Sequence, residues 1–218
     1  MFEKHLDIKH RTLTIQAVKK NLLYKKFTPF VFVKQTHQDD IKVLKNHDKL
    51  KNKSNLNLGS ADGIITNIKG VFLVIYTADC QAVLLYDYKN KIIGNVHSGW
   101  KGSIQNIIGK CVDKMINEFG ACTKNIIAGI APSLGPCCSE FINYKNEIPK
   151  VLLKYKIKKT PYFDFWKMSV DQLLNCGIKK KSIENMQICT KCRSDIFYSY
   201  RKNKTKKRFA SIISLKQK

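Results

Sequence analysis

The strongest constraint on the fold is a series of short apolar segments in the middle of the chain, separated by turns of a few residues. These segments are rich in Ile, Val, Leu and aromatic residues and cover positions 64–66, 71–76, 82–86, 91–97 and 126–130. Short apolar runs bounded by Gly, Asn or Asp are typical of buried strands. Short connections between strands favour antiparallel or mixed pairing. The pattern therefore predicts a mixed sheet.

One amphipathic helix interrupts this series. Apolar side chains recur at helical spacing from Ile104 to Phe119, which predicts a single helix with one buried face. Ser103 is the expected N-cap and Gly120 the expected C-cap. Strands combined with such a helix indicate an α/β fold.

The flanking regions add further elements. Apolar runs predict strands at 30–33 and 209–215, and helical spacing predicts helices at 146–155 and 168–176. The Lys- and Asn-rich segment 45–59 has no apolar period and is interpreted as a loop or flap. With 218 residues, 44% of them hydrophobic, the chain is expected to form one domain, 1–218.

The charge favours polyanions but not a specific nucleic-acid site. The formal net charge is +24, yet only 4 of the 40 basic residues are Arg. Specific readers of bases and phosphates depend on Arg, whose planar fork binds in a bidentate manner. The Lys residues are also dispersed along the chain. A basic nucleic-acid-binding protein is therefore kept only as an alternative.

Several features predict a cytoplasmic protein without a membrane partner. The longest apolar stretches are far shorter than the ~18 residues that a membrane-spanning helix needs. The first residues lack the charged start, apolar run and cleavage site of a secretory signal. The 8 cysteines are accordingly expected to be thiols.

Three candidate ligands each lie at the end of an apolar strand. His37 follows the strand at 30–33, Cys80 interrupts two buried strands, and His97 ends a third. One sulfur and two imidazole nitrogens suit Zn²⁺, and three protein ligands leave a fourth position for water or substrate. A metal-free pair in which His97 deprotonates Cys80 for nucleophilic attack is the competing interpretation. Asp62 and Asp79 are candidates either to orient a ligand histidine or to act as a general base.

Two further motifs carry weaker signals. The C-x-x-C motif at 189–192 and the pair Cys137 and Cys138 could form a structural zinc site, but a lone C-x-x-C favours an ordinary loop at a strand edge. Arg201 is a candidate for binding an anion through its planar fork. Lys101, near the start of the predicted helix, is a second candidate for phosphate.

Together these motifs resemble a known family. The matching blocks are Q-T-H at 35–37, A-D-G at 61–63, T-A-D-C at 77–80, V-H-S-G-W-K-G at 96–102, P-S-L-G at 132–135 and F-Y-S-Y-R-K at 197–202. The sequence resembles the laccase-domain proteins, formerly described as multicopper polyphenol oxidases and now regarded as purine nucleoside phosphorylases. The resemblance covers about residues 30–215.

The resemblance implies a fold, a metal and an activity. The implied fold is a single-domain layered α/β sandwich with mixed sheets, related to that of Cys-His toxin deamidases. The implied ligands are His37, Cys80 and His97, with zinc favoured over copper because the sequence has no His-x-His ligand pairs. The implied catalytic set is these three residues with Asp62, Asp79 and Arg201.

The implied substrates are phosphate and the purine nucleosides inosine, guanosine or adenosine. Adenosine deamination and methylthioadenosine phosphorolysis are the implied side activities, and a metal-free Cys-His hydrolase or deamidase stays the alternative. Residues 1–30 are divergent, because the family's Arg-x-Gly-Gly segment is missing and Arg11 is only a stand-in for its arginine. The motifs set no oligomeric state.

Overall fold

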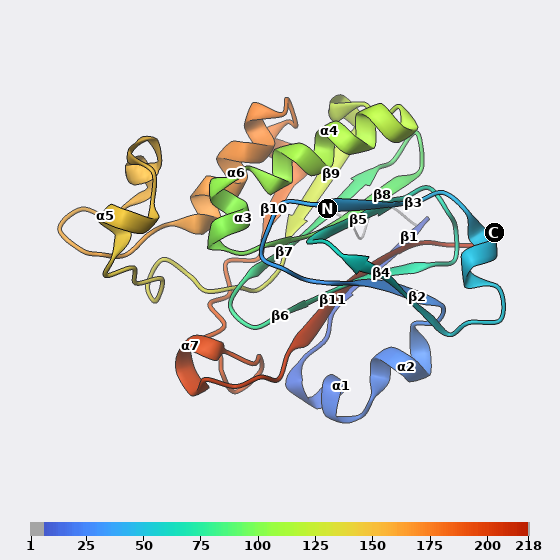
Figure 1. Ribbon diagram of the computed structural model, residues 1–218, viewed down its shortest axis with the longest axis horizontal. Helices are drawn as coiled ribbons and strands as arrows, with labels where there is room; N and C mark the ends of the chain where they lie inside the picture. The colour runs from blue at the N-terminus through green and yellow to red at the C-terminus, as the bar shows by residue number, and fades with distance from the viewer. Residues whose placement is uncertain (1–6, 218) are drawn as a thin grey trace.

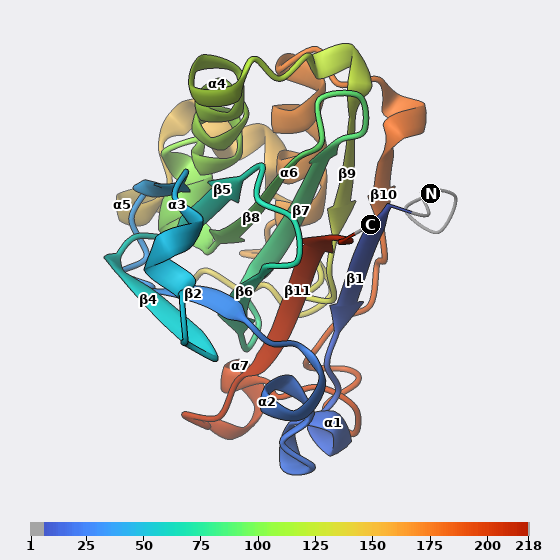
Figure 2. The ribbon, with the colours of Figure 1, turned by 90° about the vertical axis from the view of Figure 1, so that its right-hand side faces the viewer.

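Two mixed β-sheets pack face to face, with helices on the outer side of each (Figure 1 and Figure 2). The computed structural model describes residues 7–217, so the first six residues of the divergent N-terminal segment and Lys218 lie outside it. The predicted layered α/β class with mixed sheets is confirmed. Within residues 7–217, no helix has the length and apolar character needed to cross a membrane.

The first sheet has five strands in the order β1-β11-β6-β2-β4. They are β1 (Ile8–Thr12), β2 (Phe30–Lys34), β4 (Asn55–Ser60), β6 (Phe72–Thr77) and β11 (Phe209–Leu215). β2 is parallel to both of its neighbours, β4 and β6, whereas β11 is antiparallel to β6 and β1. Because β2 and β6 run in the same direction, the segments that follow them leave the sheet at the same edge.

The second sheet has six strands in the order β10-β9-β7-β8-β5-β3. They are β3 (Ile41–Leu44), β5 (Gly63–Thr66), β7 (Gln81–Asp87), β8 (Ile92–Ser98), β9 (Ile126–Ile130) and β10 (Ile183–Asn185). β7 and β8 form an antiparallel hairpin, which agrees with the antiparallel or mixed pairing predicted for strands with short connections. The links before and after β6 instead cross from one sheet to the other. β6 therefore does not pair with β5 or β7, its neighbours in sequence.

Three apolar clusters hold the layers together. The cluster between the sheets includes Val31 and Leu73 from one sheet and Leu84 and Ile93 from the other. Helices α4 (Ile107–Phe119) and α6 (Phe165–Asn175) cover the outer face of the second sheet. Helices α1 (Ile15–Lys19) and α2 (Leu22–Lys26) cover the first sheet. Burial of these apolar faces is the main stabilising contribution to the fold.

The long helix differs from its prediction at the N-terminal end. It is divided into α3 (Trp100–Ile104) and α4, because Asn106 adopts a left-handed conformation with φ 56°. The Asn106 side chain accepts from the amide of Gly109 and caps α4. Ser103, the predicted N-cap, lies inside α3 instead. Gly120 caps the C-terminus with φ 70°, as predicted.

Two other segments also differ from their predictions. The expected loop at 45–59 contains a 3₁₀ helix (His47–Leu50) and edge strand β4, whose polar residues conceal its pairing with β2. The helix expected at 146–155 is divided at Pro149 into α5 (Tyr144–Glu147) and a 3₁₀ helix (Lys150–Tyr155), since proline breaks the hydrogen-bond pattern. The remaining elements are 3₁₀ helices Thr123–Asn125 and Lys180–Ser182 and helix α7 (Tyr200–Asn203).

Candidate functional site

His37, Cys80 and His97 lie together at one edge of the sandwich. His37 follows β2 and Cys80 follows β6, while His97 is near the end of β8 in the facing sheet. One ligand atom from each residue lies within 4.8 Å of the others. The rings of the two histidines meet edge to face, with 4.8 Å between their centroids. The structure thus brings together the three residues that the sequence indicated as one set.

Asp62 is the centre of the hydrogen bonds that hold this set. Its carboxylate is fully buried and accepts from the backbone amides of Thr36, His37 and Gln38 at 2.9–3.1 Å. It also accepts from the Thr36 hydroxyl at 2.9 Å and from Nδ1 of His97 at 2.7 Å. One carboxylate therefore fixes both the loop that carries His37 and the ring of His97.

This contact determines which nitrogen of His97 can bind a ligand. Because Nδ1 bonds to Asp62, Nε2 is the atom left for a metal or a proton. Burial alone would raise the pKa of Asp62, but the hydrogen bonds from His97 and the 36–38 loop hold it at about 2. Asp62 is therefore an ionised carboxylate suited to positioning its partners.

Cys80 and His97 stabilise each other's charged forms in the metal-free chain. Burial acts against both charges, yet the positive charge of His97 and hydrogen bonds from both histidines lower the pKa of the Cys80 thiol to about 6. The negative charge of Cys80 and the hydrogen bond to Asp62 in turn raise the pKa of His97 to about 9. Cys80 is consequently available as a thiolate, the form that binds metals.

Gly99 leaves space between the three candidate ligands. A Cβ atom at this position would lie 3.2 Å from Sγ of Cys80, 3.5 Å from Cδ2 of His37 and 3.6 Å from Cε1 of His97. Because φ of Gly99 is −78°, its backbone does not require glycine. The residue instead keeps open the space that the donor atoms surround, as a bound metal ion requires.

Asp79 contacts a different part of the site. Its backbone has φ 87°, a left-handed conformation that is costly for a non-glycine residue. Its carboxylate accepts from the Thr190 hydroxyl at 2.7 Å and from the Arg201 backbone amide at 2.6 Å. Asp79 therefore connects the turn before Cys80 to the segments that carry Thr190 and Arg201, rather than orienting a ligand histidine.

A pocket of about 1020 Å³ opens beside the three candidate ligands and has an aromatic wall. Phe141 packs at 5.2 Å from Phe165 and at 5.8 Å from Trp100, measured between ring centroids. Two of the lining residues, Thr77 and Gln81, also carry buried polar atoms. The Thr77 hydroxyl and Oε1 of Gln81 have no hydrogen-bond partner within the described part of the chain.

The pocket also has a cationic side, which the sequence predicted only in part. Arg201 lines it, held by a hydrogen bond to the Glu140 carbonyl at 2.7 Å and lying 5.8 Å from the centroid of Phe141. Lys204, Lys206 and Arg208 line it as well. Lys204 and Lys206 were missed because the run of lysines at 202–207 has the composition of a solvated surface, and Arg208 directly follows that run.

Two predicted cations lie elsewhere. Lys101 is exposed, its ammonium lies 5.6 Å from the centroid of Trp100, and it is not among the described residues that line the pocket. Its proximity to the start of α3 therefore does not bring it to the site. Arg11 lies in β1, paired with Ile212, and is likewise outside the described lining.

Comparison with known proteins identifies close relatives in sequence. The family model described as multi-copper polyphenol oxidoreductase laccase matches residues 9–216. The chain is 31% identical to the purine nucleoside phosphorylase Cj1217c of Campylobacter jejuni, over 99% of this chain and 90% of that protein. It is 36% identical to a purine nucleoside phosphorylase of Aquifex aeolicus, over 70% of this chain and 69% of that one.

Solved structures share the fold. The YfiH protein of Bacillus licheniformis superposes with a TM-score of 0.77 at 28% identity, over 92% of this chain and 79% of that one. YlmD of Geobacillus stearothermophilus gives 0.76 at 22% identity, over 93% and 79%. The resemblance inferred from the motifs is confirmed: the chain belongs to the family described as multi-copper polyphenol oxidoreductase laccase.

Proposed function

We propose that this protein is a metal-dependent purine nucleoside phosphorylase that acts on inosine, guanosine or adenosine. The observation that carries the proposal is one pocket that combines a His-Cys-His donor set, an aromatic wall and four cationic side chains. Relatives that are 31% and 36% identical carry the name purine nucleoside phosphorylase, which supports the same activity.

The donor set suits a catalytic zinc ion. His37, Cys80 and His97 would hold the ion, and three protein ligands with an open position are typical of catalytic zinc. When bound there, zinc would supply Lewis-acid chemistry beside the substrate. The contact between Asp62 and His97 is the carboxylate–histidine arrangement that fixes a ligand imidazole in the correct tautomer. We accordingly assign Asp62 a positioning role.

The cationic side of the pocket suits phosphate. A guanidinium can donate two parallel hydrogen bonds to phosphate oxygens, and Lys adds compact positive charge. Arg201 is the best placed, because its guanidinium is already held by the Glu140 carbonyl and Phe141. Asp79 bonds the Arg201 backbone amide and so positions this residue. Arg201 is therefore the proposed phosphate ligand.

The aromatic side of the pocket suits a purine. Flat bases stack on aromatic rings, and Phe141, Phe165 and Trp100 provide such rings. A purine nucleoside offers the flat ring that this wall would bind.

The proposed reaction is a displacement at the sugar. A phosphate oxygen forms a bond to C1′, and the bond between C1′ and the purine nitrogen breaks. The electron pair leaves with the purine, which takes up a proton. The products are the free base and ribose 1-phosphate. Holding phosphate and nucleoside in one pocket supplies the proximity on which such a reaction depends.

Product analysis tests the proposal. Purified protein is incubated separately with inosine, guanosine, adenosine and methylthioadenosine, with and without phosphate, and the products are separated by chromatography. Phosphate-dependent release of the free base supports phosphorolysis. Inosine formed from adenosine reports deamination. Phosphate-dependent release of adenine from methylthioadenosine reports methylthioadenosine phosphorolysis. A Cys80→Ala variant should lose turnover, whereas Cys122→Ala, which changes an exposed thiol, should keep it.

A metal-free Cys-His hydrolase or deamidase is the second candidate. It is favoured by the contacts from Asp62 to His97 and from His97 to Cys80, which is the arrangement of a base-activated nucleophile. In that case activity would survive complete chelation, and a substrate adduct would form on Cys80. Loss of activity on chelation and its return with zinc would exclude this candidate.

We also propose a cytoplasmic location. All 8 cysteines lie within the described residues and are free thiols, as is usual in a reducing compartment. Fractionation of cells that express the tagged protein tests this location.

A further inference from the structure

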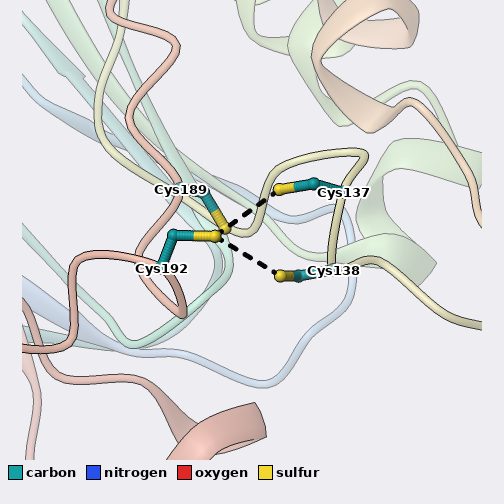
Figure 3. Close-up of side chains that lie close together, drawn as sticks. All are labelled: Cys137, Cys138, Cys189 and Cys192. Atoms are coloured by element: carbon teal, nitrogen blue, oxygen red, sulfur yellow. Dashed lines mark hydrogen bonds between the residues drawn. The ribbon is translucent and has the colours of Figure 1, made fainter.

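A second group of sulfur atoms lies outside the pocket lining. Cys137, Cys138, Cys189 and Cys192 each offer an Sγ atom, and the four atoms lie within 4.8 Å of one another. Figure 3 shows the side chains converging from two loops, one after β9 and one before α7. The sequence favoured an ordinary loop at a strand edge for the C-x-x-C motif. The structure places the motif in such a loop, with an isolated bridge between Cys189 and Ser133, and it also brings the two cysteine pairs together.

We propose that these four cysteines bind one Zn²⁺ ion as a structural site, separate from the His37, Cys80 and His97 centre. The chemical class of the ligand follows from the donors, since four thiolates select zinc over the harder divalent cations. Four protein ligands also complete a tetrahedral shell, which leaves no open position for catalysis.

The sulfur separations fit tetrahedral coordination. Zn–S bonds of ~2.3 Å place two sulfurs of a tetrahedral site about 3.8 Å apart. Sγ of Cys192 lies 3.7 Å from both Cys137 and Cys138 (Figure 3). A disulfide would instead need a separation of about 2.05 Å, and all four residues are free thiols. The distances therefore suit a shared ion.

Backbone amides point at the most buried sulfur. The Gly135 amide donates to Sγ of Cys189 at 3.3 Å, and the Cys192 amide donates to the same sulfur. Amide donors favour the thiolate form of a sulfur, the form that a metal requires. The local structure therefore favours the metal-binding form of the Cys189 sulfur.

Other contacts hold the two loops in register. The Ser133 amide donates to the Ile188 carbonyl at 3.1 Å, and the Thr190 amide donates to the Ser133 carbonyl at 3.0 Å. Gly135 lets its loop approach Cys189 and Trp166 closely, because a Cβ at this position would lie 3.1 Å from Cβ of Cys189 and 2.8 Å from the Trp166 ring. The cysteines are therefore positioned by packing and not by chance proximity of mobile loops.

The proposed ion would stabilise the wall of the pocket. Thr190, which follows Cys189, bonds to Asp79, and Asp79 also bonds to the Arg201 amide. Leu134 and Ser139, on either side of Cys137 and Cys138, line the pocket. A metal that joins the two loops would keep these residues in place. This role does not depend on which reaction the pocket catalyses.

Metal analysis of matched variants tests the proposal. Zinc per chain is measured by mass spectrometry of the elements after reloading with zinc and desalting. The expected contents are two for wild type, one for Cys80→Ala and one for the double variant Cys137→Ser with Cys192→Ser. Cys122→Ser, which changes an exposed thiol outside both groups, should retain two. If the double variant Cys137→Ser with Cys192→Ser had the same zinc content as wild type, the proposal would be overturned.

A second measurement avoids dependence on a variant that fails to fold. Cys80→Ala keeps all four clustered cysteines, so Co²⁺ bound to this variant should give the intense near-ultraviolet sulfur-to-cobalt absorption of a thiolate site. Absence of this absorption, or an intact mass that shows the four cysteines as disulfides, would contradict the proposal. Because the readout is the metal and not turnover, it is separate from any failure of the phosphorylase assignment.

Discussion

Asp62 holds His97 at two points. Its carboxylate accepts from Nδ1 of the His97 ring at 2.7 Å, and its carbonyl oxygen accepts from the His97 backbone amide at 2.7 Å. The same carboxylate bonds the amide of His37. Two candidate metal ligands from facing sheets are thus oriented by one buried residue, and this relationship leads to the first prediction.

Asp62→Asn should weaken zinc binding by about 10- to 100-fold, the usual effect of removing a carboxylate that orients a ligand histidine. The side-chain amide of the variant carries no negative charge, and its nitrogen cannot accept a hydrogen bond. His97 and the loop that carries His37 therefore lose their fixed orientation. Competition with a coloured chelator measures the affinity. Asp39→Asn, which removes only a surface ion pair with Lys110, is the matched control. Equal affinity in the two variants would remove Asp62 from this role.

Gly99→Ala should lower zinc affinity about tenfold or more while the protein stays folded, because overpacking costs about 1–3 kcal/mol. The new methyl group would lie 3.2 Å from Sγ of Cys80, inside the space between the ligands. Circular dichroism verifies the fold, and the chelator competition gives the affinity. Wild-type affinity in this variant would show that the space between the three side chains is not a metal site.

Arg201→Ala should raise the KM for phosphate about tenfold or more and change the KM for nucleoside much less. A charge-assisted hydrogen bond contributes about 1.5–3 kcal/mol, which sets this range. Lys101→Ala is the control, since Lys101 is exposed and its ammonium lies over Trp100. Steady-state kinetics at varied phosphate concentration give the KM for phosphate of each variant. A larger effect from Lys101 than from Arg201 would reverse their proposed roles.

Alkylation of Cys80 in the chelated protein should have a midpoint near pH 6, since the thiol pKa is lowered to about 6 from its ordinary value of 9.0. Thiolate is the reactive form, so a lowered pKa keeps Cys80 reactive at neutral pH and the rate falls only below pH 6. Peptide mass spectrometry after iodoacetamide treatment follows this residue alone. Added zinc should protect it. A midpoint near pH 9 would contradict the charge pairing with His97.

The three candidate ligands could be predicted because each polar residue directly follows or ends an apolar strand. That pattern places His37, Cys80 and His97 at strand ends, and parallel β2 and β6 bring the first two to one edge. Their roles in binding metal and in catalysis stay predictions. Asp62 was found through its motif, but the five hydrogen bonds that its carboxylate accepts depend on long-range packing that sequence spacing does not encode.

Other parts of the site could not be predicted for physical reasons. The two cysteine pairs are far apart in sequence, and long-range contacts of Ser133 and Gly135 with the 188–190 segment bring them together. Lys204 and Lys206 belong to a charged run whose composition is the same whether it faces solvent or a pocket. The break between α3 and α4 depends on the left-handed backbone of Asn106, which apolar periodicity does not reveal.

The central claim is phosphorolysis that requires a metal. Phosphorus NMR of purified protein with inosine and phosphate tests it most directly, using zinc-loaded, chelated and zinc-restored samples. The account predicts a ribose 1-phosphate signal that grows in the zinc-loaded sample, is absent after chelation and returns with zinc. Equal ribose 1-phosphate formation in the chelated sample, or loss of inosine with no ribose 1-phosphate signal in any sample, would contradict it.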